Sequence, residues 1–148
     1  MAFRILLGFL LGSLLTSFQF LNADTRQLKR SDGSVVEFHI YLPAVEKFSL
    51  IIGLQGSECK PALKGGMGRF APIFDSLGFG FLLVEKPGIY GGSADEKCPE
   101  EYLELNTIAQ RISDIQLVIL ALRNDEAFLK NWNGSLIWEG GSEGGTVA

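Results

Sequence analysis

The fold of this chain is decided by the stretch Trp138-Glu139-Gly140-Gly141-Ser142-Glu143-Gly144-Gly145-Thr146. A short apolar run, residues 135–138, leads into it and predicts a β-strand. Residues 140–144 then match the pattern G-x-S-x-G, in which a serine stands at a sharp turn between a strand and a helix. Glycines are needed beside the serine because a β-carbon there would collide with the neighbouring strand and helix. The pattern predicts Ser142 as a nucleophile, and the alternative is a polar residue in an ordinary glycine-rich turn.

Two further strands are predicted upstream of this turn from continuous apolar runs, Phe48–Leu54 and residues 80–85. Runs of this kind are typical of strands that are buried on both faces of a parallel sheet. Between them, residues 67–77 carry apolar side chains at helical spacing, and a second amphipathic helix is predicted over residues 108–123. The intervening segment 86–105 is rich in glycine and proline and is predicted to be a long loop.

A β-hairpin is predicted over residues 25–42, with its turn at Asp32-Gly33. Its second strand alternates between apolar and polar residues, with Glu37 and His39 on the polar face. Alternation indicates one wet face, so we expect these strands at the edge of the sheet and His39 in solvent. The order of elements predicts an α/β fold with a mostly parallel sheet and an antiparallel N-terminal hairpin.

Three segments at the predicted strand ends resemble the N-terminal half of an α/β-hydrolase. The first is the serine turn, which matches the nucleophile elbow of that family. The second is Leu54-Gln55-Gly56-Ser57, where the family often has His-Gly followed by an oxyanion-hole residue. The third is Glu85-Lys86-Pro87-Gly88-Ile89-Tyr90-Gly91-Gly92-Ser93, which looks like the family's Asp-x-Pro-Gly-x-Gly-x-Ser loop. Gln55 and Glu85 depart from the family's histidine and aspartate.

The resemblance implies where the chemistry would lie. Ser142 would be the nucleophile, and the backbone N–H groups of Glu143 and Ser57 would stabilise the oxyanion of the transition state. The alternative for residues 55–57 is an ordinary turn after a strand. In this family the acid and the histidine follow the serine in the sequence, whereas His39, the one histidine, precedes it. We therefore expect an α/β-hydrolase-like fold that is incomplete C-terminally, and a chain that is a fragment of a longer protein.

Residues 1–23 are predicted to be a signal peptide. Arg4 precedes an apolar stretch, and Ala23 is a plausible last residue before cleavage. The alternative is a membrane anchor, but a spanning helix needs about 20 apolar residues and polar side chains interrupt this run. We expect a secreted or periplasmic protein without stable membrane insertion after cleavage, in which residues 24–148 form the N-terminal part of an α/β-hydrolase domain.

The two cysteines, Cys59 and Cys98, both lie in the part that export would deliver to an oxidising compartment. Each is expected in a loop after one of two neighbouring strands, which predicts a disulfide between them, with two free thiols as the alternative. Two cysteines so far apart in sequence are not metal spacing, and no phosphate-loop pattern occurs, so no metal or cofactor is expected. The net charge of −4 argues against nucleic acid as a partner.

These observations predict a serine hydrolase that cleaves an ester or peptide bond in a small-molecule ester or peptide substrate, through an acyl-enzyme on Ser142. The second hypothesis is a non-catalytic, secreted binding or interaction module that lacks a triad. An acidic loop and then a histidine loop, encoded after Ala148, would decide for the enzyme.

Overall fold

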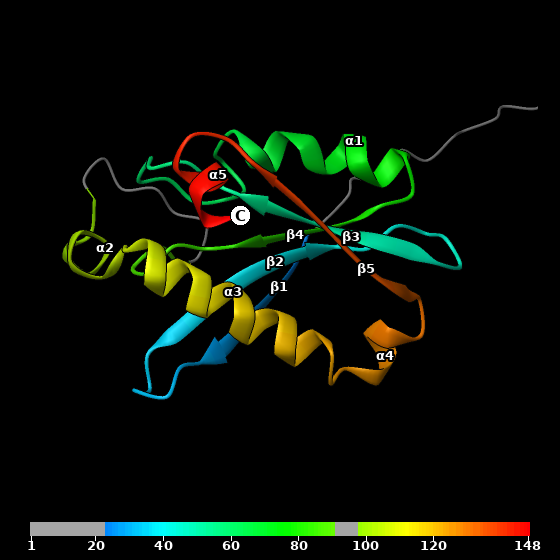
Figure 1. Cartoon of the computed structure of the whole chain (residues 1–148), viewed down its shortest axis with the longest axis horizontal. Helices are drawn as coiled ribbons and strands as arrows, with labels where there is room; N and C mark the ends of the chain where they lie inside the picture. The colour runs from blue at the N-terminus through cyan, green and yellow to red at the C-terminus, as the bar shows by residue number, and fades with distance from the viewer. Residues whose placement is uncertain (1–22, 91–97) are drawn as a thin grey trace, which may run out of the picture.

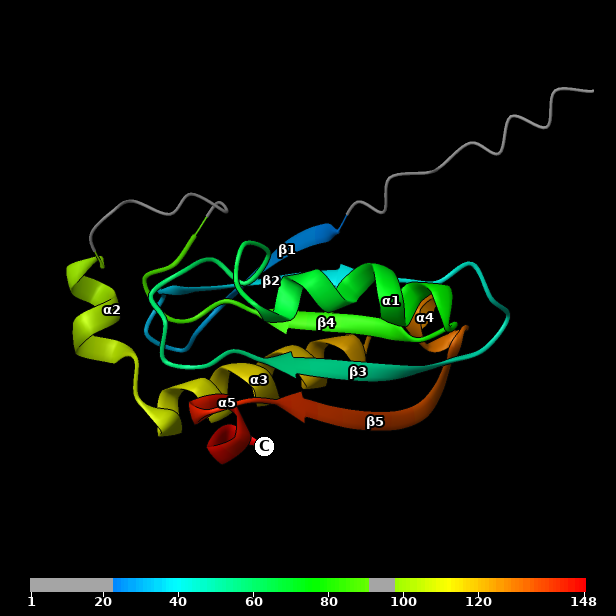
Figure 2. The same ribbon diagram turned by 90° about the horizontal axis from the view of Figure 1, so that it is seen from above.

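The computed structural model describes residues 23–90 and 98–148, and its centre is a five-stranded mixed sheet. The strand order is β1-β2-β4-β3-β5, which Figure 2 shows from one edge to the other. The strands are β1 (Asp24–Lys29), β2 (Val35–Tyr41), β3 (Phe48–Leu54), β4 (Gly80–Val84) and β5 (Trp132–Gly140). β3 runs parallel to β4 and β5, whereas β2 runs antiparallel to β1 and β4. This arrangement confirms the predicted fold class.

Helices cover both faces of the sheet (Figure 1). On one face lie η1 (Met67–Phe70) and α1 (Ala71–Ser76), and on the other lie α3 (Ile108–Leu122) and α4 (Glu126–Leu129). Two shorter helices, α2 (Glu100–Leu105) and α5 (Glu143–Val147), flank the edge where β3 and β5 end. A core that is closed on both faces explains why β3 and β4 are continuous apolar runs.

The predicted hairpin forms around its Asp-Gly turn. Gly33 has φ +89°, which glycine adopts without strain. The Asp32 carboxylate accepts a hydrogen bond from the Ser34 amide at 2.9 Å, and the Arg30 amide donates to the Ser34 carbonyl at 2.8 Å. The position of β2 differs from the prediction. Of the two hairpin strands, β1 lies at the edge of the sheet, whereas β2 pairs with β1 on one side and β4 on the other.

Two predicted helices are found with small changes, and two further helices were not predicted. The helix over residues 67–77 begins as the 3₁₀ turn η1 before it continues as α1, and α3 matches the second amphipathic pattern. α2 lies within the segment predicted to be a loop, and α4 is a single turn that is capped by the Asp125 side chain. Helices this short contain too few apolar positions for a periodic pattern to show.

Strand β5 begins earlier than its apolar run suggests. The apolar run begins at residue 135, but Asn133 and Gly134 also lie within β5. The register between β3 and β5 shifts between Phe48 and Leu50, and Gly134 has φ +87°. Between these two pairs β5 has two residues more than β3, so Gly134 lies outside regular pairing and can adopt a conformation that suits glycine.

Within residues 23–90 and 98–148, no helix is long and apolar enough to cross a membrane. The predicted signal peptide lies outside the described residues, apart from Ala23.

Candidate active site

Ser142 stands at the turn between β5 and α5, where its backbone has φ +56° and ψ −129°. Among the described residues it is the one residue other than glycine with a positive φ. This conformation is strained for a residue with a β-carbon, and such strain is concentrated at functional turns. The Gly144 amide donates to the Gly141 carbonyl at 3.0 Å and the Gly145 amide donates to the Ser142 carbonyl at 3.0 Å. These bonds hold the turn, and Ser142 is left exposed.

Two glycines of the turn, Gly140 and Gly144, are required by close packing, as the sequence predicted, whereas a β-carbon on Gly141 would meet no atom within 4 Å. A β-carbon on Gly140 would lie 2.7 Å from the carbonyl carbon of Gly144. A β-carbon on Gly144 would collide with the carbonyl of Leu54 at the end of β3. Real β-carbons do not approach backbone atoms this closely, so the turn can pack against β3 only with glycine at these positions.

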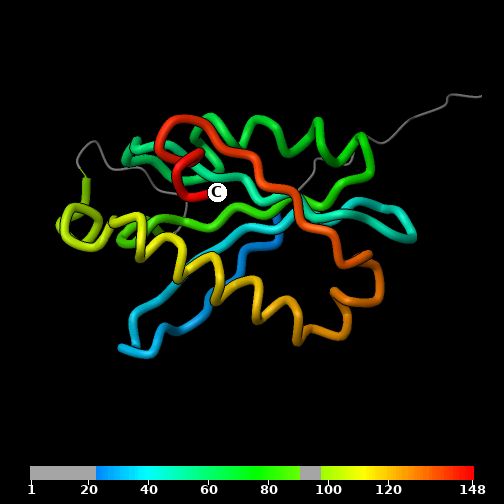
Figure 3. The backbone as a smooth tube through the Cα atoms, in the orientation of Figure 1, coloured from blue at the N-terminus to red at the C-terminus, as the bar shows by residue number. Residues whose placement is uncertain are grey.

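The loop that follows β3 lies against the serine turn. A β-carbon on Gly56 would lie 3.6 Å from the Ser142 β-carbon and 3.8 Å from the Gly141 carbonyl oxygen. β3 and β5 run parallel with Leu54 opposite Gly140, so the carboxyl ends of both strands lie on the same side of the sheet. Figure 3 shows the C-terminal segment turning back beside the end of β3. The structure therefore brings together two of the segments that the sequence singled out.

Side chains from three different elements hold residues 55–58, which we call the β3 loop. Each carbonyl of the β3 loop accepts a hydrogen bond from a side chain. The pairs are Arg111 with Gln55, Lys86 with Gly56 and Glu58, and Tyr102 with Ser57. Sequence reasoning assigned no role to these three donors. The signal for Lys86 was its place inside the third segment of the resemblance, and the signal for Arg111 was a charge four residues before Ile115, at the helical spacing of the apolar face.

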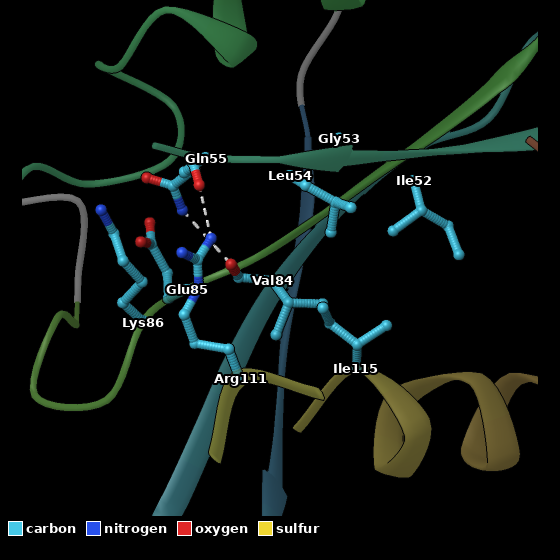
Figure 4. Close-up of a pocket in the computed structure, with 9 residues that line it drawn as sticks. All are labelled: Ile52, Gly53, Leu54, Gln55, Val84, Glu85, Lys86, Arg111 and Ile115. Atoms are coloured by element: carbon cyan, nitrogen blue, oxygen red, sulfur yellow. Dashed lines mark hydrogen bonds between the residues drawn. The ribbon is translucent and has the colours of Figure 1, made fainter. Parts of the chain in front are cut away.

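Arg111 also joins the β3 loop to the serine turn. The residue is 5% exposed, and its guanidinium donates to the Gln55 carbonyl at 2.5 Å and to the Glu143 carboxylate at 2.5 Å. Figure 4 shows the guanidinium beside Gln55, between the ends of β3 and β4. The Glu143 carboxylate lies in the first turn of α5, where a negative charge is favourable, and it forms an ion pair with Arg111.

Lys86 is a buried cation, with only 2% of its surface exposed. Its ammonium lies 5.6 Å from the centre of the Tyr102 ring, within the range of a cation–π contact. Burial lowers the pKa of Lys86, and the nearby Arg111 charge lowers it further, while the carboxylates of Glu58, Glu143 and Glu85 act in the opposite direction.

Gln55 stands at the position where α/β-hydrolases often have a histidine, and its side chain is buried. The Gln55 Nε2 donates to the Val84 carbonyl at 3.3 Å, whereas its Oε1 has no hydrogen-bond partner in the described part of the chain. A cavity of about 10 Å³ lies beside it, lined also by Glu85, Lys86 and Arg111 (Figure 4). That volume admits about one water molecule, which would satisfy the amide oxygen.

His39 is not in solvent, and its predicted exposure was wrong. The side chain is 1% exposed, with Nε2 3.0 Å from the Glu85 carboxylate and Nδ1 2.8 Å from the Thr25 hydroxyl. Alternation marked this face as polar, but loop residues around Ala62 cover it and hydrogen bonds satisfy its polar groups. Three strand spacings separate β2 from β5, roughly 14 Å, so His39 cannot reach Ser142.

Glu37, His39 and Glu85 are the described residues that could hold a metal ion, with their ligand atoms within 4.8 Å of one another. Hydrogen bonds account for this cluster without one. The two Glu85 oxygens accept from the Ala62 amide at 2.8 and 2.9 Å, and Gln27 donates to Glu37 at 2.8 Å. The cluster therefore joins β1, β2 and β4 to the loop that precedes η1.

Cys59 and Cys98 are free thiols that lie near each other. Burial raises the pKa of Cys59 to about 11, and a hydrogen bond with Cys98 raises it in the same direction. The thiol of Cys59 is therefore almost wholly protonated at neutral pH. The disulfide between these two residues stays a prediction.

Similarity to solved structures agrees with this geometry. No protein-family model matches the sequence, and no curated protein matches it. The structure of DcsB in complex with its substrate analogue matches 86% of this chain with a TM-score of 0.64 and 20% identity. Acylaminoacyl peptidase from Pyrococcus horikoshii matches 87% of the chain with a TM-score of 0.61 and 16% identity. The chain has the α/β-hydrolase fold.

Brefeldin A esterase, a bacterial homologue of human hormone-sensitive lipase, also shares this fold. It matches 98% of the chain with a TM-score of 0.58 and 17% identity. The chain spans 39% of the length of DcsB, 20% of the peptidase and 37% of the esterase. At these identities the α/β-hydrolase likeness concerns the fold, and the chemistry depends on the residues of the site.

Proposed function

We propose that this α/β-hydrolase chain belongs to a serine hydrolase that cleaves an ester or peptide bond, with Ser142 as the nucleophile. The observation that carries the proposal is the strained backbone of Ser142 at an exposed turn, packed against the β3 loop. A turn of this shape presents the serine hydroxyl at the edge of the sheet, where a substrate can reach it.

The proposed reaction has two steps. The Ser142 hydroxyl oxygen attacks the carbonyl carbon of the substrate while a base accepts its proton, and the bond to the leaving group breaks as that group takes up the proton. Water then attacks the resulting acyl-enzyme, which releases the acid and restores the hydroxyl. The negative charge on the carbonyl oxygen would be stabilised by the backbone N–H groups of Glu143 and Ser57.

Both proposed donors are available in the structure. Within the described residues, no hydrogen bond uses the N–H of Ser57, and the N–H of Glu143 begins α5 without a partner in the helix. The β3 loop and the serine turn approach each other through Gly56 and Ser142. These features support an oxyanion hole between the two segments.

The base and its acid are proposed to come from residues outside these 148. The chain has one histidine, His39, and its ring nitrogens are occupied by Glu85 and Thr25 at a distance from Ser142. A serine hydroxyl is a weak nucleophile without an adjacent base. This proposal therefore concerns the protein that contains the chain.

The substrate class is proposed as a small-molecule ester or peptide. Both an esterase and a peptidase occur among the solved structures with this fold, and DcsB was solved with a substrate analogue. Secretion or periplasmic export is proposed from the apolar stretch after Arg4 and from Ala23 at a suitable cleavage position.

Covalent labelling by a fluorophosphonate probe tests the function. In the protein expressed from its complete reading frame, we expect rapid labelling that Ser142→Ala abolishes, with a loss of esterase activity on the order of 10⁴-fold or more. Ser113→Ala removes an exposed serine of α3 and should leave labelling unchanged. Persistent labelling of the folded Ser142→Ala protein, or a wild type that neither labels nor hydrolyses esters, would instead favour a non-catalytic binding module.

A further inference from the structure

We propose that Lys86 is a positioning residue that aims the Ser57 N–H at the oxyanion, and this inference rests on the proposed function. The group on which Lys86 acts is the peptide unit between Gly56 and Ser57. The geometry of that unit, the burial of the lysine and the partners of its ammonium each support the assignment.

In the Gly56–Ser57 peptide unit, the hydrogen bond that the Gly56 carbonyl accepts fixes the direction in which the Ser57 N–H points. The Lys86 ammonium donates to the Gly56 carbonyl at 2.9 Å. The described residues contain no cis peptide bond, and in a planar trans peptide the C=O and the following N–H point in opposite directions. Holding the Gly56 carbonyl toward Lys86 therefore turns the Ser57 N–H away from Lys86. The N–H has no partner within the described residues, so it stays free to bind a ligand atom.

An ammonium group is suited to this position because it donates in several directions. Lys86 also donates to the Glu58 carbonyl, so it holds the Gly56–Ser57 peptide unit and the Glu58–Cys59 peptide unit. A lysine presents three donors from one nitrogen, and no other single side chain group does this so compactly. The ammonium also lies 5.6 Å from the centre of the Tyr102 ring, and the Tyr102 hydroxyl donates to the Ser57 carbonyl at 2.6 Å.

Burying a cation has a large desolvation cost, and the partners of the Lys86 ammonium indicate which part of the structure it stabilises. The side chain is 2% exposed, and within the described part of the chain its hydrogen bonds are to backbone carbonyls and not to a carboxylate. An apolar side chain would fill the same space without the cost of desolvating a charge. The ammonium stabilises two carbonyls of a loop that lies beside Ser142, which is where fixed donors contribute to catalysis.

The experiment compares Lys86→Met with Lys64→Met in the protein expressed from its complete reading frame. Lys64 is an exposed lysine close to the same loop, which makes it the matched control. Hydrolysis of a p-nitrophenyl ester is measured per active serine, counted by fluorophosphonate titration. We expect Lys86→Met to lower kcat by about 100-fold with little change in KM, because an oxyanion donor acts in the transition state. Lys64→Met should match the wild type.

A second readout separates positioning from stability. A trifluoromethyl ketone forms a tetrahedral adduct with an activated serine and places a negative oxygen in the oxyanion hole. Its affinity should fall by about the same factor as kcat in Lys86→Met, whereas a merely structural role would lower only the number of active serines. If the methionine variant does not fold, Lys86→Arg carries the test, since it keeps a cation and donors. Its planar guanidinium cannot place its donors as the ammonium does, and kcat should fall at least tenfold.

The outcomes are distinct. A wild type that labels and turns over, together with a folded Lys86 variant whose kcat per active serine and ketone affinity are unchanged, overturns the role of Lys86 and leaves the proposed function standing. If Lys86→Met does not fold and Lys86→Arg has the full activity of the wild type, the role of Lys86 is likewise overturned and the proposed function stands. A wild type that neither labels nor hydrolyses esters overturns the proposed function and the role of Lys86 together.

Discussion

Glu85 and Lys86 are neighbours in the sequence after β4, yet they belong to two different clusters of buried polar groups. Lys86 lies with Arg111 and Tyr102 around the β3 loop, and its donors contact backbone carbonyls. Glu85 lies with His39 under the Ala62 amide, where its partners are a side chain and one backbone N–H. We call these the lysine cluster and the histidine cluster.

The difference lies in what each cluster fixes. The lysine cluster fixes the orientation of peptide units beside Ser142, including one whose N–H has no hydrogen-bond partner among residues 23–90 and 98–148. The histidine cluster joins β1 and β2 to β4. Its hydrogen bonds connect His39 to Thr25 and Glu85, and Glu85 to the Ala62 amide. Both remove polar groups from water, which is costly unless they are hydrogen-bonded. We infer that changes in the lysine cluster alter catalysis, whereas changes in the histidine cluster alter stability.

The largest difference between the clusters is expected for Arg111→Met. Arg111 bonds the carbonyl of Gln55 and the carboxylate of Glu143, so its loss frees both segments of the proposed oxyanion hole. We expect kcat per active serine to fall by about 10²–10³-fold, the range found when an oxyanion donor is removed. Steady-state kinetics with active-site titration measure this effect.

Arg30→Met is the matched control for Arg111→Met. Arg30 is another arginine with little exposure, 9% of its side chain, and it bonds Asp114 through two contacts of 2.7 and 2.8 Å. Breaking a buried pair leaves a charge without its partner, so both variants should lower the free energy of unfolding by about 3 kcal/mol. Only Arg111→Met should change kcat, and equal kinetic losses in the two variants would show that catalysis merely follows stability.

Alkylation of Cys59 reports on packing next to the β3 loop. Burial raises the pKa of this thiol from 9.0 to about 11, and the thiolate is the reactive form. In the reduced, folded protein at pH 8, iodoacetamide should modify Cys59 about 100-fold more slowly than in the unfolded chain, because each pH unit lowers the thiolate fraction tenfold. Peptide mass spectrometry distinguishes Cys59 from Cys98, and equal rates in both states would contradict this packing.

The same thiol links stability to pH in the reduced protein. Its pKa is raised in the folded state, so its contribution to stability is present in full below pH 9 and is lost as the pH rises through about 11. Unfolding in urea across that range should show the decline, and Cys59→Ser should make it shallower.

The smallest effect on catalysis is expected for His39→Ala. This change leaves Glu85 without its histidine partner and should lower the free energy of unfolding by about 2–4 kcal/mol. Fluorophosphonate labelling per folded molecule should change by less than about twofold, because three strand spacings separate His39 from Ser142. Labelling that disappears from a folded His39→Ala protein would remove the distinction between the two clusters.

Much of the fold could be predicted from the sequence, because apolar runs and turn residues indicate local structure directly. Strand β3 was predicted with its observed bounds, Phe48–Leu54, since a run buried on both faces is apolar throughout. The Asp-Gly turn and the glycines around Ser142 were also predicted, since each reflects a conformation or contact that only certain residues permit. α2 and α4 were not predicted, because one or two turns do not show a helical period.

The sequence by itself determined that a strained serine follows a strand, and that a glycine loop follows another strand. These are local properties, decided by backbone sterics and by the pattern of apolar residues. Only the tertiary structure decided that Arg111, Tyr102 and Lys86 meet at one loop, and that His39 is buried. Those contacts join residues far apart in the chain, and the partner of a polar side chain depends on which strands and helices pack together. A sequence pattern records polarity at a position, but burial and hydrogen bonding decide what that polarity does.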